Sequence, residues 1–354
     1  MAFPVVMLLI AYARYKKPKT GIIVTCILLF FSMFRGDGVG KDTLSYMDEN
    51  GIAYSTTLYY EGFGGESVFD VLGNQTEIAS NFLNYLVHDY NLPTRVIIYA
   101  YSIVTILFLF FGLKRLKIDI SWGMAFYVLL GLYFFSLSAA RQMAAVSIFV
   151  YGLTYLFNED KKKFLFFAYT ILATTIHASA IFFIWLYVLK LFKKIDRTWL
   201  FAIMALFSLI TIFMSFDITD IIYSVFNIEY IQRYKGHFDE SGRSVLGRIN
   251  DIVSYGFLLY IFKIRKNTRG DLYDCFFAVA VVLMALFGHS SGLIARVAYY
   301  TTIFICFYAP KVILERNYLK QQDFITFFLL YVLLKTYNNR MWTEALTSGY
   351  YLMF

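Results

Sequence analysis

The chain has 354 residues, of which 59% are hydrophobic and only 16% are charged. Soluble domains carry about 25% charged residues, so the composition excludes an ordinary soluble protein and indicates a protein of the lipid bilayer. The net charge of +8 does not indicate nucleic-acid binding, because basic loops are ordinary orientation signals in membrane proteins. We expect a single transmembrane domain over residues 1–354.

Membrane-spanning helices need about 17 to 25 apolar residues, or fewer where neighbouring helices cover their ends. On this basis the sequence predicts an all-α, polytopic fold of about twelve transmembrane helices. Their apolar cores are residues 2–13, 21–34, 94–113, 122–138, 141–157, 164–177, 178–192, 198–215, 251–263, 272–288, 292–310 and 323–337. The three cysteines, Cys26, Cys275 and Cys306, lie within these cores. We therefore interpret them as small core residues rather than as a disulfide framework or metal ligands.

Basic residues gather in alternate loops, beginning after the first predicted helix. The loops lie at residues 14–20, 114–121, 158–163, 190–197, 263–271 and 311–322. This side of the chain holds 21 of the 32 basic residues and 8 of the 24 acidic ones, a net charge of +13 against −5 for the other side. The positive-inside rule assigns the basic side to the cytoplasm, so we expect both termini to face outward.

Two long loops, residues 35–93 and 216–250, fall on the predicted outer side. In the first loop, apolar residues recur at helical spacing: Ile78, Phe82, Leu83, Leu86, Val87 and Tyr90. The opposite face carries Asn81, Asn84 and His88. This pattern predicts an amphipathic helix that lies on the membrane surface. The second loop begins with a similar apolar stripe and continues into a basic segment.

Ionisable side chains gather near the outer ends of the predicted helices. All four histidines, His88, His177, His237 and His289, lie on the outer side. Arg141 begins a helix there, and Arg296 lies about one turn inside a late span. An arginine in an apolar span costs about 2.5–3.5 kcal/mol on insertion scales, so it usually faces a polar cavity and an anion. Ordinary alternatives are an interfacial Arg141, a structural ion pair for Arg296 and a hydrogen-bonding role for His177.

The start of the first outer loop, residues 35–43, reads RGDGVGKDT and has glycines at alternate positions. The segment is neither a Walker A motif nor followed by a Lys-Ser/Thr pair, and it faces the wrong compartment for ATP. We therefore do not interpret it as a nucleotide site. Aromatic side chains further along this loop can stack on sugar rings: Tyr46, Tyr59, Tyr60 and Phe63.

An ordered set of short motifs is similar to one known family. Arg35, the Gly40–Thr43 segment and Tyr46 resemble the R…GxD…Y pattern that follows an early helix in EpsG-type proteins. The further matches, in the same order, are Arg141-Gln142 at a helix start, His177–Ala180 at a helix junction, and Arg296 followed by Tyr299-Tyr300. The resemblance runs from about residue 20 to residue 310. Lys41 departs from it, since we expect a smaller residue there.

EpsG-type proteins are Wzy-like polymerases of bacterial exopolysaccharide, capsule and O-antigen. The resemblance implies a GT-C-like membrane glycosyltransferase of the bacterial inner membrane, with its active site facing the periplasm or the cell exterior. The growing chain would leave its polyprenyl-diphosphate carrier and join a hydroxyl of the next lipid-linked repeat unit. No cofactor and no metal are expected, because the leaving group is already activated and arginines can neutralise its charge.

That chemistry assigns roles to the matched residues and their neighbours. The candidates for diphosphate binding are Arg35, Arg141, Arg243, Arg248 and Arg296, whose guanidinium groups stabilise developing charge without titrating. The candidates for the base that activates the acceptor hydroxyl are Asp42, Glu66 and His177, with Asp42 the first choice and His177 its rival. The sugar-binding candidates are Tyr46, Gln142, Tyr299 and Tyr300. We expect Arg141 and Arg296 to converge on one outward-opening cavity with Arg35 and either Arg243 or Arg248.

The expected partners are the polyprenyl-diphosphate-linked donor and acceptor, the bilayer, and a flippase and a chain-length regulator, with no nucleic acid. An O-antigen ligase or a transferase with a polyprenyl-phosphate sugar donor is an alternative that differs mainly in its acceptor. A flippase or other transporter is a further alternative, although transporters place ionisable residues near the midplane and often contain repeats. His177 also leaves a membrane acyltransferase open.

Overall fold

The computed structural model describes most of the predicted membrane core. The described residues are 19–36, 39–40, 77–157, 162–192, 195–214, 245–265, 270–287, 292–315, 325, 328–329 and 331–332. The predicted first span, at 2–13, and most of both outer loops lie outside them. The regular elements in the described part are helices, which confirms the all-α prediction. Contacts between Cα atoms divide the chain into two compact units, Met1–Trp185 with Asn339–Phe354, and Leu186–Asn338.

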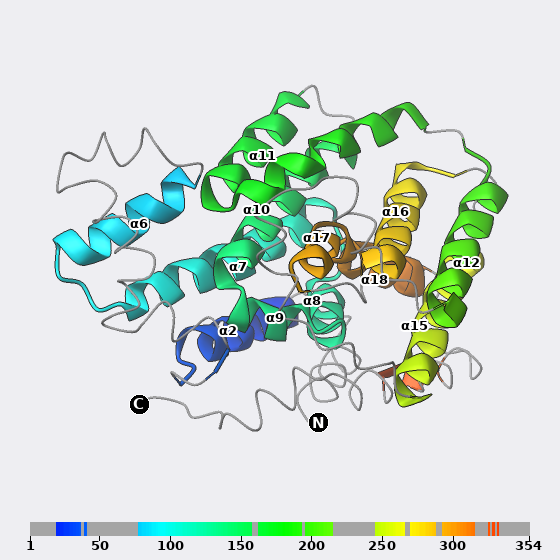
Figure 1. The fold of residues 1–354 in the computed structure, drawn as a ribbon, viewed down its shortest axis with the longest axis horizontal. Coiled ribbons are helices and arrows are strands. Elements are labelled where there is room, and N and C mark those ends of the chain that lie inside the picture. The colour runs from blue at the N-terminus through cyan, green and yellow to red at the C-terminus, as the bar shows by residue number, and fades with distance from the viewer. Residues whose placement is uncertain are drawn as a thin grey trace. The chain divides into compact units, whose positions relative to one another are not determined.

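The first unit is built around one central helix. Its elements are α2 (Lys19–Met33), α6 (Ile78–Asp89), α7 (Arg95–Arg115), α8 (Ile120–Leu129), α9 (Leu132–Ser138), α10 (Ala140–Phe157), α11 (Phe164–Ile176) and the start of the 3-10 helix η1 (Ala178–Phe192). Helix α10 packs against both α7 and α11 (Figure 1). Close approach depends on Gly152, because a Cβ atom there would lie 2.8 Å from Cβ of Tyr169. Small residues serve this purpose between membrane helices, where backbones must approach.

The predicted span at 122–138 is two helices rather than one. Asp119 caps the first of them, α8, by accepting a hydrogen bond from the Trp122 backbone N–H at 3.0 Å. Gly131, with a φ of +78°, then ends α8 in the left-handed conformation that commonly terminates helices. The chain bends by 65° between α8 and α9. The bend directs the chain through α9 into the start of α10, where Arg141 lies.

Helix α6 confirms the predicted helix in the first outer loop. Its polar side chains Ser80, Asn81 and Asn84 are buried, and it packs against α7 and α11. The apolar side chains of Ile78 and Phe82 are instead 38% and 42% exposed. This is the reverse of a helix on a soluble protein. It is the arrangement expected where the outward face of a helix meets lipid.

The second unit contains four helices that follow each other closely in the chain, preceded by α12. They are α12 (Arg197–Met214), α15 (Val245–Ile264), α16 (Leu272–Phe287), α17 (Gly292–Thr302) and α18 (Ile305–Glu315). Helix α16 packs against α12 and α17, and α15 packs against α12 and α18. The hydroxyl of Thr211 donates to the carbonyl of Ala285 at 2.8 Å, a polar contact typical of helix pairs in membranes. Because α15 begins at Val245, Arg248 belongs to its first turn rather than to the predicted loop.

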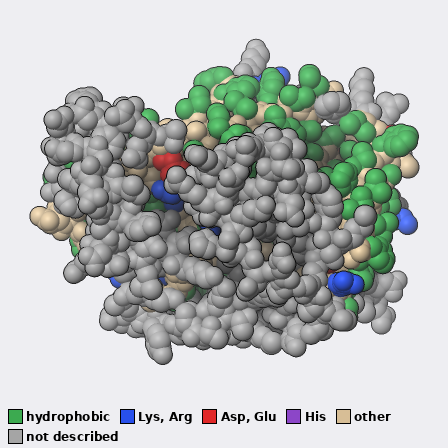
Figure 2. Space-filling model, in the orientation of Figure 1, with side chains coloured by type: hydrophobic (Ala, Val, Ile, Leu, Met, Phe, Trp, Pro, Cys, Tyr) green, Lys and Arg blue, Asp and Glu red, His purple; other side chains and the backbone are tan. Residues whose placement is uncertain are grey.

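Two of the described helical segments are long and apolar enough to cross a membrane, Arg95–Arg115 and Arg296–Glu315. A third is added if the bent pair α8 and α9 forms one span. Hydrophobic side chains gather on the outer surface of α12 and over α11 and η1 (Figure 2). Trp199 and Phe213 on α12 are 68% and 74% exposed. These features support a membrane protein, and the count of twelve spans stays a prediction.

Candidate functional site

The carboxylate of Glu77 joins two of the residues that the sequence singled out. Its Oε2 lies 2.9 Å from Nη1 of Arg141, and its Oε1 lies 2.8 Å from Nδ1 of His177. The backbone N–H of Ala178 also donates to Oε1 at 3.0 Å. We call Arg141, Glu77 and His177 the outer triad, after the side of the membrane on which the sequence places them. The triad lies entirely within the first unit.

Helix ends position all three side chains. Glu77 directly precedes α6, and its carbonyl accepts the first helical bond from the Asn81 N–H at 3.0 Å. Arg141 lies in the first turn of α10, where the helix dipole disfavours a cation, so an acidic partner offsets the cost. His177 lies in extended backbone between α11 and η1, with a φ of −147°. That break, predicted at 177–178, turns the imidazole out of the helical ladder.

The triad is partly buried and electrically matched. The side chains of Arg141, Glu77 and His177 are 32%, 18% and 25% exposed. Burial by itself would raise the pKa of Glu77, but the hydrogen bond from His177 and the charge of Arg141 outweigh it. The Ala178 N–H adds to this effect, and the pKa lies below its ordinary value of 4.5. Glu77 is therefore ionised at neutral pH and can only accept hydrogen bonds.

The glycine-rich segment at the start of the first outer loop packs beside the triad. Gly40 has a φ of +92°, and a Cβ atom there would lie 2.2 Å from the carbonyl oxygen of Leu137 near the end of α9. The adjacent Val39 is 1% exposed. Since Leu137 precedes Arg141 by about one helical turn, Gly40 brings the predicted motif to the start of α10. The glycine serves close packing, not a nucleotide.

Arg35 lies at the end of α2 and is only 1% exposed. Its Nη1 donates to the carbonyl of Ser32 at 3.0 Å, and its own carbonyl accepts a bond from Nη1 of Arg95 at 3.1 Å. In this arrangement the guanidinium of Arg35 is enclosed by protein, and its diphosphate role stays a prediction. Sequence reasoning did not single out Arg95. Its position in the first turn of α7, where the dipole disfavours a cation, is the signal that was available.

The other described candidates are distributed over both units. Gln142 follows Arg141 in α10 and is buried. Arg296 and Tyr299 on α17 are half-buried, and Tyr300 is completely buried. Arg248, on α15, is exposed. The predicted convergence of these second-unit arginines with Arg141, and the sugar-binding roles, stay predictions.

Several candidates lie outside the described residues: Asp42, Tyr46, Glu66 and Arg243. Within the part of the chain that the structure describes, no three His, Cys, Asp or Glu residues are grouped as metal ligands would be. Asp37, which could join Asp42 and Glu66 around a cation, is also undescribed. The expectation of a metal-free site therefore stays a prediction.

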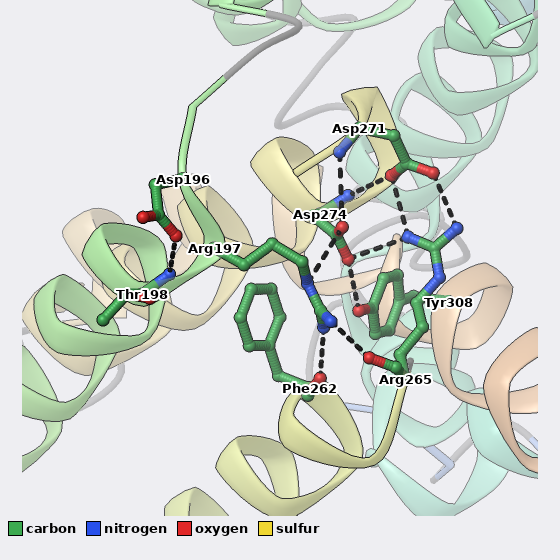
Figure 3. Close-up of polar contacts among 8 residues, drawn as sticks. All are labelled: Asp196, Arg197, Thr198, Phe262, Arg265, Asp271, Asp274 and Tyr308. Atoms are coloured by element: carbon green, nitrogen blue, oxygen red, sulfur yellow. Dashed lines mark hydrogen bonds and ion pairs between the residues drawn. The ribbon is translucent and has the colours of Figure 1, made fainter. Parts of the chain in front are cut away.

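A second ionised cluster, which the sequence did not predict, lies in the second unit (Figure 3). Arg265 donates to both oxygens of Asp271, at 2.8 and 2.6 Å, and to Oδ1 of Asp274 at 2.8 Å. Nε of Arg197 pairs with Oδ2 of Asp274 at 3.3 Å, while its terminal nitrogens donate to the carbonyls of Phe262 and Arg265. The side chain of Asp274 has no exposed surface. We call this group, with Tyr308, the inner cluster, after the predicted cytoplasmic position of Arg265.

The apolar helices and the outer triad define a helical membrane protein with an ionised, partly exposed site at helix ends. The chain belongs to the EpsG family, whose model matches residues 19–352. This match confirms the resemblance drawn from the motifs and suggests a polysaccharide-polymerase-like function. In the same comparisons, no curated protein and no solved structure matched the chain.

Proposed function

We propose that this protein is a membrane glycosyltransferase that polymerises polyprenyl-diphosphate-linked oligosaccharide repeat units on the extracytoplasmic side. One observation carries the proposal: Arg141 and His177, which the family motifs supply from distant segments, meet on the carboxylate of Glu77. A cation suited to diphosphate and a group suited to proton transfer thus lie at one place. Membership of the EpsG family supports the reaction class.

Arg141 stabilises the leaving group. As the bond between the donor's anomeric carbon and the diphosphate breaks, negative charge develops on the diphosphate oxygens. A guanidinium binds such oxygens through charge-assisted, paired hydrogen bonds and does not lose its proton. Arg141 is 32% exposed at the start of α10, so the group is accessible to a headgroup at the membrane surface. The helix N-terminus adds a further positive potential there.

His177 acts as the base. The acceptor hydroxyl attacks the anomeric carbon, its oxygen forms the new glycosidic bond, and its proton passes to Nε2 of His177. The electron pair of the broken C–O bond leaves with the polyprenyl diphosphate. Because Nδ1 already faces Glu77, Nε2 is the ring nitrogen directed away from the carboxylate. An imidazole is suited to this step because its ordinary pKa lies near neutral pH.

The setting follows from the same proposal. The enzyme lies in the bacterial inner membrane with the outer triad toward the periplasm or cell exterior, where lipid-linked repeat units arrive after a flippase. A chain-length regulator is its natural partner, since a polymerase alone sets no product length. The alternation of basic loops supports this orientation.

Purified protein in lipid nanodiscs, given a defined polyprenyl-diphosphate-linked repeat unit, tests the proposal. We expect a ladder of polymer products and release of polyprenyl diphosphate in equal steps. His177→Ala should lower the rate by about 100-fold or more, the range for loss of a general base. Arg141→Lys and Arg296→Lys should impair polymer formation without loss of protein, because lysine cannot present a planar fork.

Arg115→Lys is the matched control, because Arg115 stacks on Tyr155 at 3.7 Å at the other end of α7 from Arg95. It should keep wild-type polymer formation. Wild-type protein that transfers one glycan to a non-repeat acceptor and forms no ladder would identify a ligase instead. Wild-type rates from both Arg141→Lys and Arg296→Lys would overturn the diphosphate role.

A further inference from the structure

We infer that Glu77 is a positioning residue of this site, which fixes the tautomer and ring orientation of His177 and couples that base to Arg141. The inference rests on the proposed function for its kinetic consequence. Its structural core, the tautomer of His177, can be measured without substrate. Neither the motifs nor the family match assigned a role to Glu77.

The tautomer follows from the hydrogen-bonding inventory. An ionised carboxylate has no proton to donate, so the 2.8 Å contact with Glu77 requires that Nδ1 of His177 carry the proton. In neutral imidazole the other nitrogen then bears the lone pair. Nε2 is thereby left as the acceptor that a base needs. A carboxylate behind a histidine has this same effect in hydrolytic triads, where it holds the ring and stabilises the imidazolium that forms.

The carboxylate is itself held in place by the backbone. The N–H of Ala178 donates to the same Oε1 atom that faces His177, at 3.0 Å. Glu77 begins α6, whose buried polar face packs on α7 and α11. The orientation of Glu77 therefore depends on the fold and not on a bound substrate. Such preorganisation is what allows a positioning group to act without reorganising during the reaction.

The contact with Arg141 makes the link to the leaving group. Glu77 and a diphosphate are both anions that attract the same guanidinium, so Glu77 restrains Arg141 in the free site. Removal of the negative charge should not weaken binding of an anionic donor. A residue that merely held the fold together would instead impair binding and turnover alike. The two roles therefore predict different changes in KM and kcat.

The tautomer is measured by nitrogen NMR on protein labelled with ¹⁵N-histidine. The chain contains only four histidines, so His177 can be assigned as the resonances that disappear in His177→Gln. We expect wild-type protein at mildly alkaline pH to show a protonated Nδ1 and an unprotonated Nε2. Glu77→Ala should mix the tautomers or reverse them. An unprotonated Nδ1 in the wild type, or an unchanged spectrum in Glu77→Ala, overturns the inference.

The kinetic test uses the polymerisation assay with three substitutions of Glu77. Glu77→Ala should lower kcat by about 100-fold with no rise in KM for the lipid-linked donor. Glu77→Gln should lower kcat less, because the amide oxygen can still accept from Nδ1, and Glu77→Asp should restore part of the loss by returning the charge. Glu315→Gln, at an exposed carboxylate on α18, is the control and should match the wild type.

The two levels of proposal fail separately. If the wild type forms no polymer, the proposed function fails, while the NMR result still decides the role of Glu77 toward His177. If the wild type is active and His177→Ala is inactive but all Glu77 variants keep wild-type kcat, only the inference about Glu77 fails. Equal loss of kcat and donor binding in Glu77→Gln and Glu77→Asp would indicate a structural residue and also overturn it.

Discussion

The hydroxyl of Tyr308 lies 2.6 Å from Oδ1 of Asp274, a carboxylate with no exposed surface in the first turn of α16. The same carboxylate contacts Arg265 from the end of α15 and Arg197 from the start of α12. Four helices of the second unit thus meet on one side chain. A buried carboxylate is costly unless its oxygens are fully paired, and here charged and neutral donors share that task.

Replacing Asp274 should therefore destabilise the second unit strongly. Asp274→Asn keeps the side-chain volume but leaves Arg265 and Arg197 without their shared negative charge. Removal of one partner from a buried ion pair costs about 3–5 kcal/mol. Thermal unfolding in detergent, followed by loss of soluble protein, should show a clear fall in Tm. Asp196→Asn is the matched control, since Asp196 is exposed and asparagine caps helices equally well. A Tm for Asp274→Asn equal to that of the control would contradict this prediction.

Acid should weaken the same cluster through Asp271. Burial alone would raise the pKa of Asp271, but the hydrogen bonds and charge of Arg265 outweigh it and hold the pKa below its ordinary value of 3.8. A depressed folded-state pKa contributes stability that is fully present above the unfolded-state pKa and is lost as pH falls through the folded-state pKa. The gap in Tm between wild type and Asp271→Asn should therefore be constant from pH 7 to about pH 5 and close below about pH 4. A gap that widens in acid would show the opposite sign.

The inner cluster also shows where inference from sequence stops. Arg197 and Arg265 were counted as cytoplasmic loop charges, and the positive-inside rule uses their position without asking whether they are paired. Asp274 lies within an apolar run, which is a signal for a buried partner. That signal does not say which of the nearby arginines is the partner. Only the packing of α12, α15 and α16 decides it.

The outer triad was half predictable. Arg141 and His177 stood out because each interrupts an apolar segment at a helix end, where an ionisable side chain needs a reason. Glu77 did not, because an isolated acid before an amphipathic helix carries no periodic signal. Likewise, hydropathy predicted a span at 122–138, but the 65° bend depends on the left-handed conformation of Gly131, which hydropathy does not detect. Helix existence was read correctly where packing only had to agree with the apolar pattern.

Gly40 should tolerate no side chain. A Cβ atom there would meet the Leu137 carbonyl oxygen at 2.2 Å, and the φ of +92° is unfavourable for any other residue. We expect Gly40→Ala to push the loop off the start of α10 and to abolish most polymer formation. Gly152→Ala is a useful comparison, since it crowds Tyr169 in the same helix about 16 Å along the axis from Arg141. If both variants lose equal activity at equal protein level, the effect of Gly40 is on general stability and not on the site.

Membrane topology can be tested by cysteine labelling in intact cells. The background protein needs its three cysteines replaced, above all Cys26, which is exposed. Thr43→Cys and Ser244→Cys, in the two predicted outer loops, should react with an impermeant maleimide. Lys162→Cys, in a predicted cytoplasmic loop, should react only after permeabilisation. The reverse pattern would place the outer triad in the cytoplasm and remove the basis for a lipid-diphosphate donor.

The last prediction separates His177 from Asp42 as the base and, with it, a metal-free from a metal-dependent site. We assign neutralisation of the diphosphate to arginines, so polymerisation should continue in excess EDTA. His177→Ala should then lose about 100-fold or more in rate while donor binding survives, whereas Asp42→Asn should lose little. The choice of His177 over Asp42 follows from its contact with an ionised Glu77, which directs a lone pair away from the triad.

The opposite outcomes have a definite meaning. Loss of activity in EDTA that magnesium or manganese restores would make Asp37, Asp42 and Glu66 candidate ligands, because such hard cations prefer carboxylate oxygens. His177 would then remain the base beside a metal-bound diphosphate. Activity in EDTA together with a large loss in Asp42→Asn and none in His177→Ala would transfer the base role to the first outer loop. In that case the outer triad would serve only to bind the diphosphate through Arg141, and Glu77 would have no base to orient.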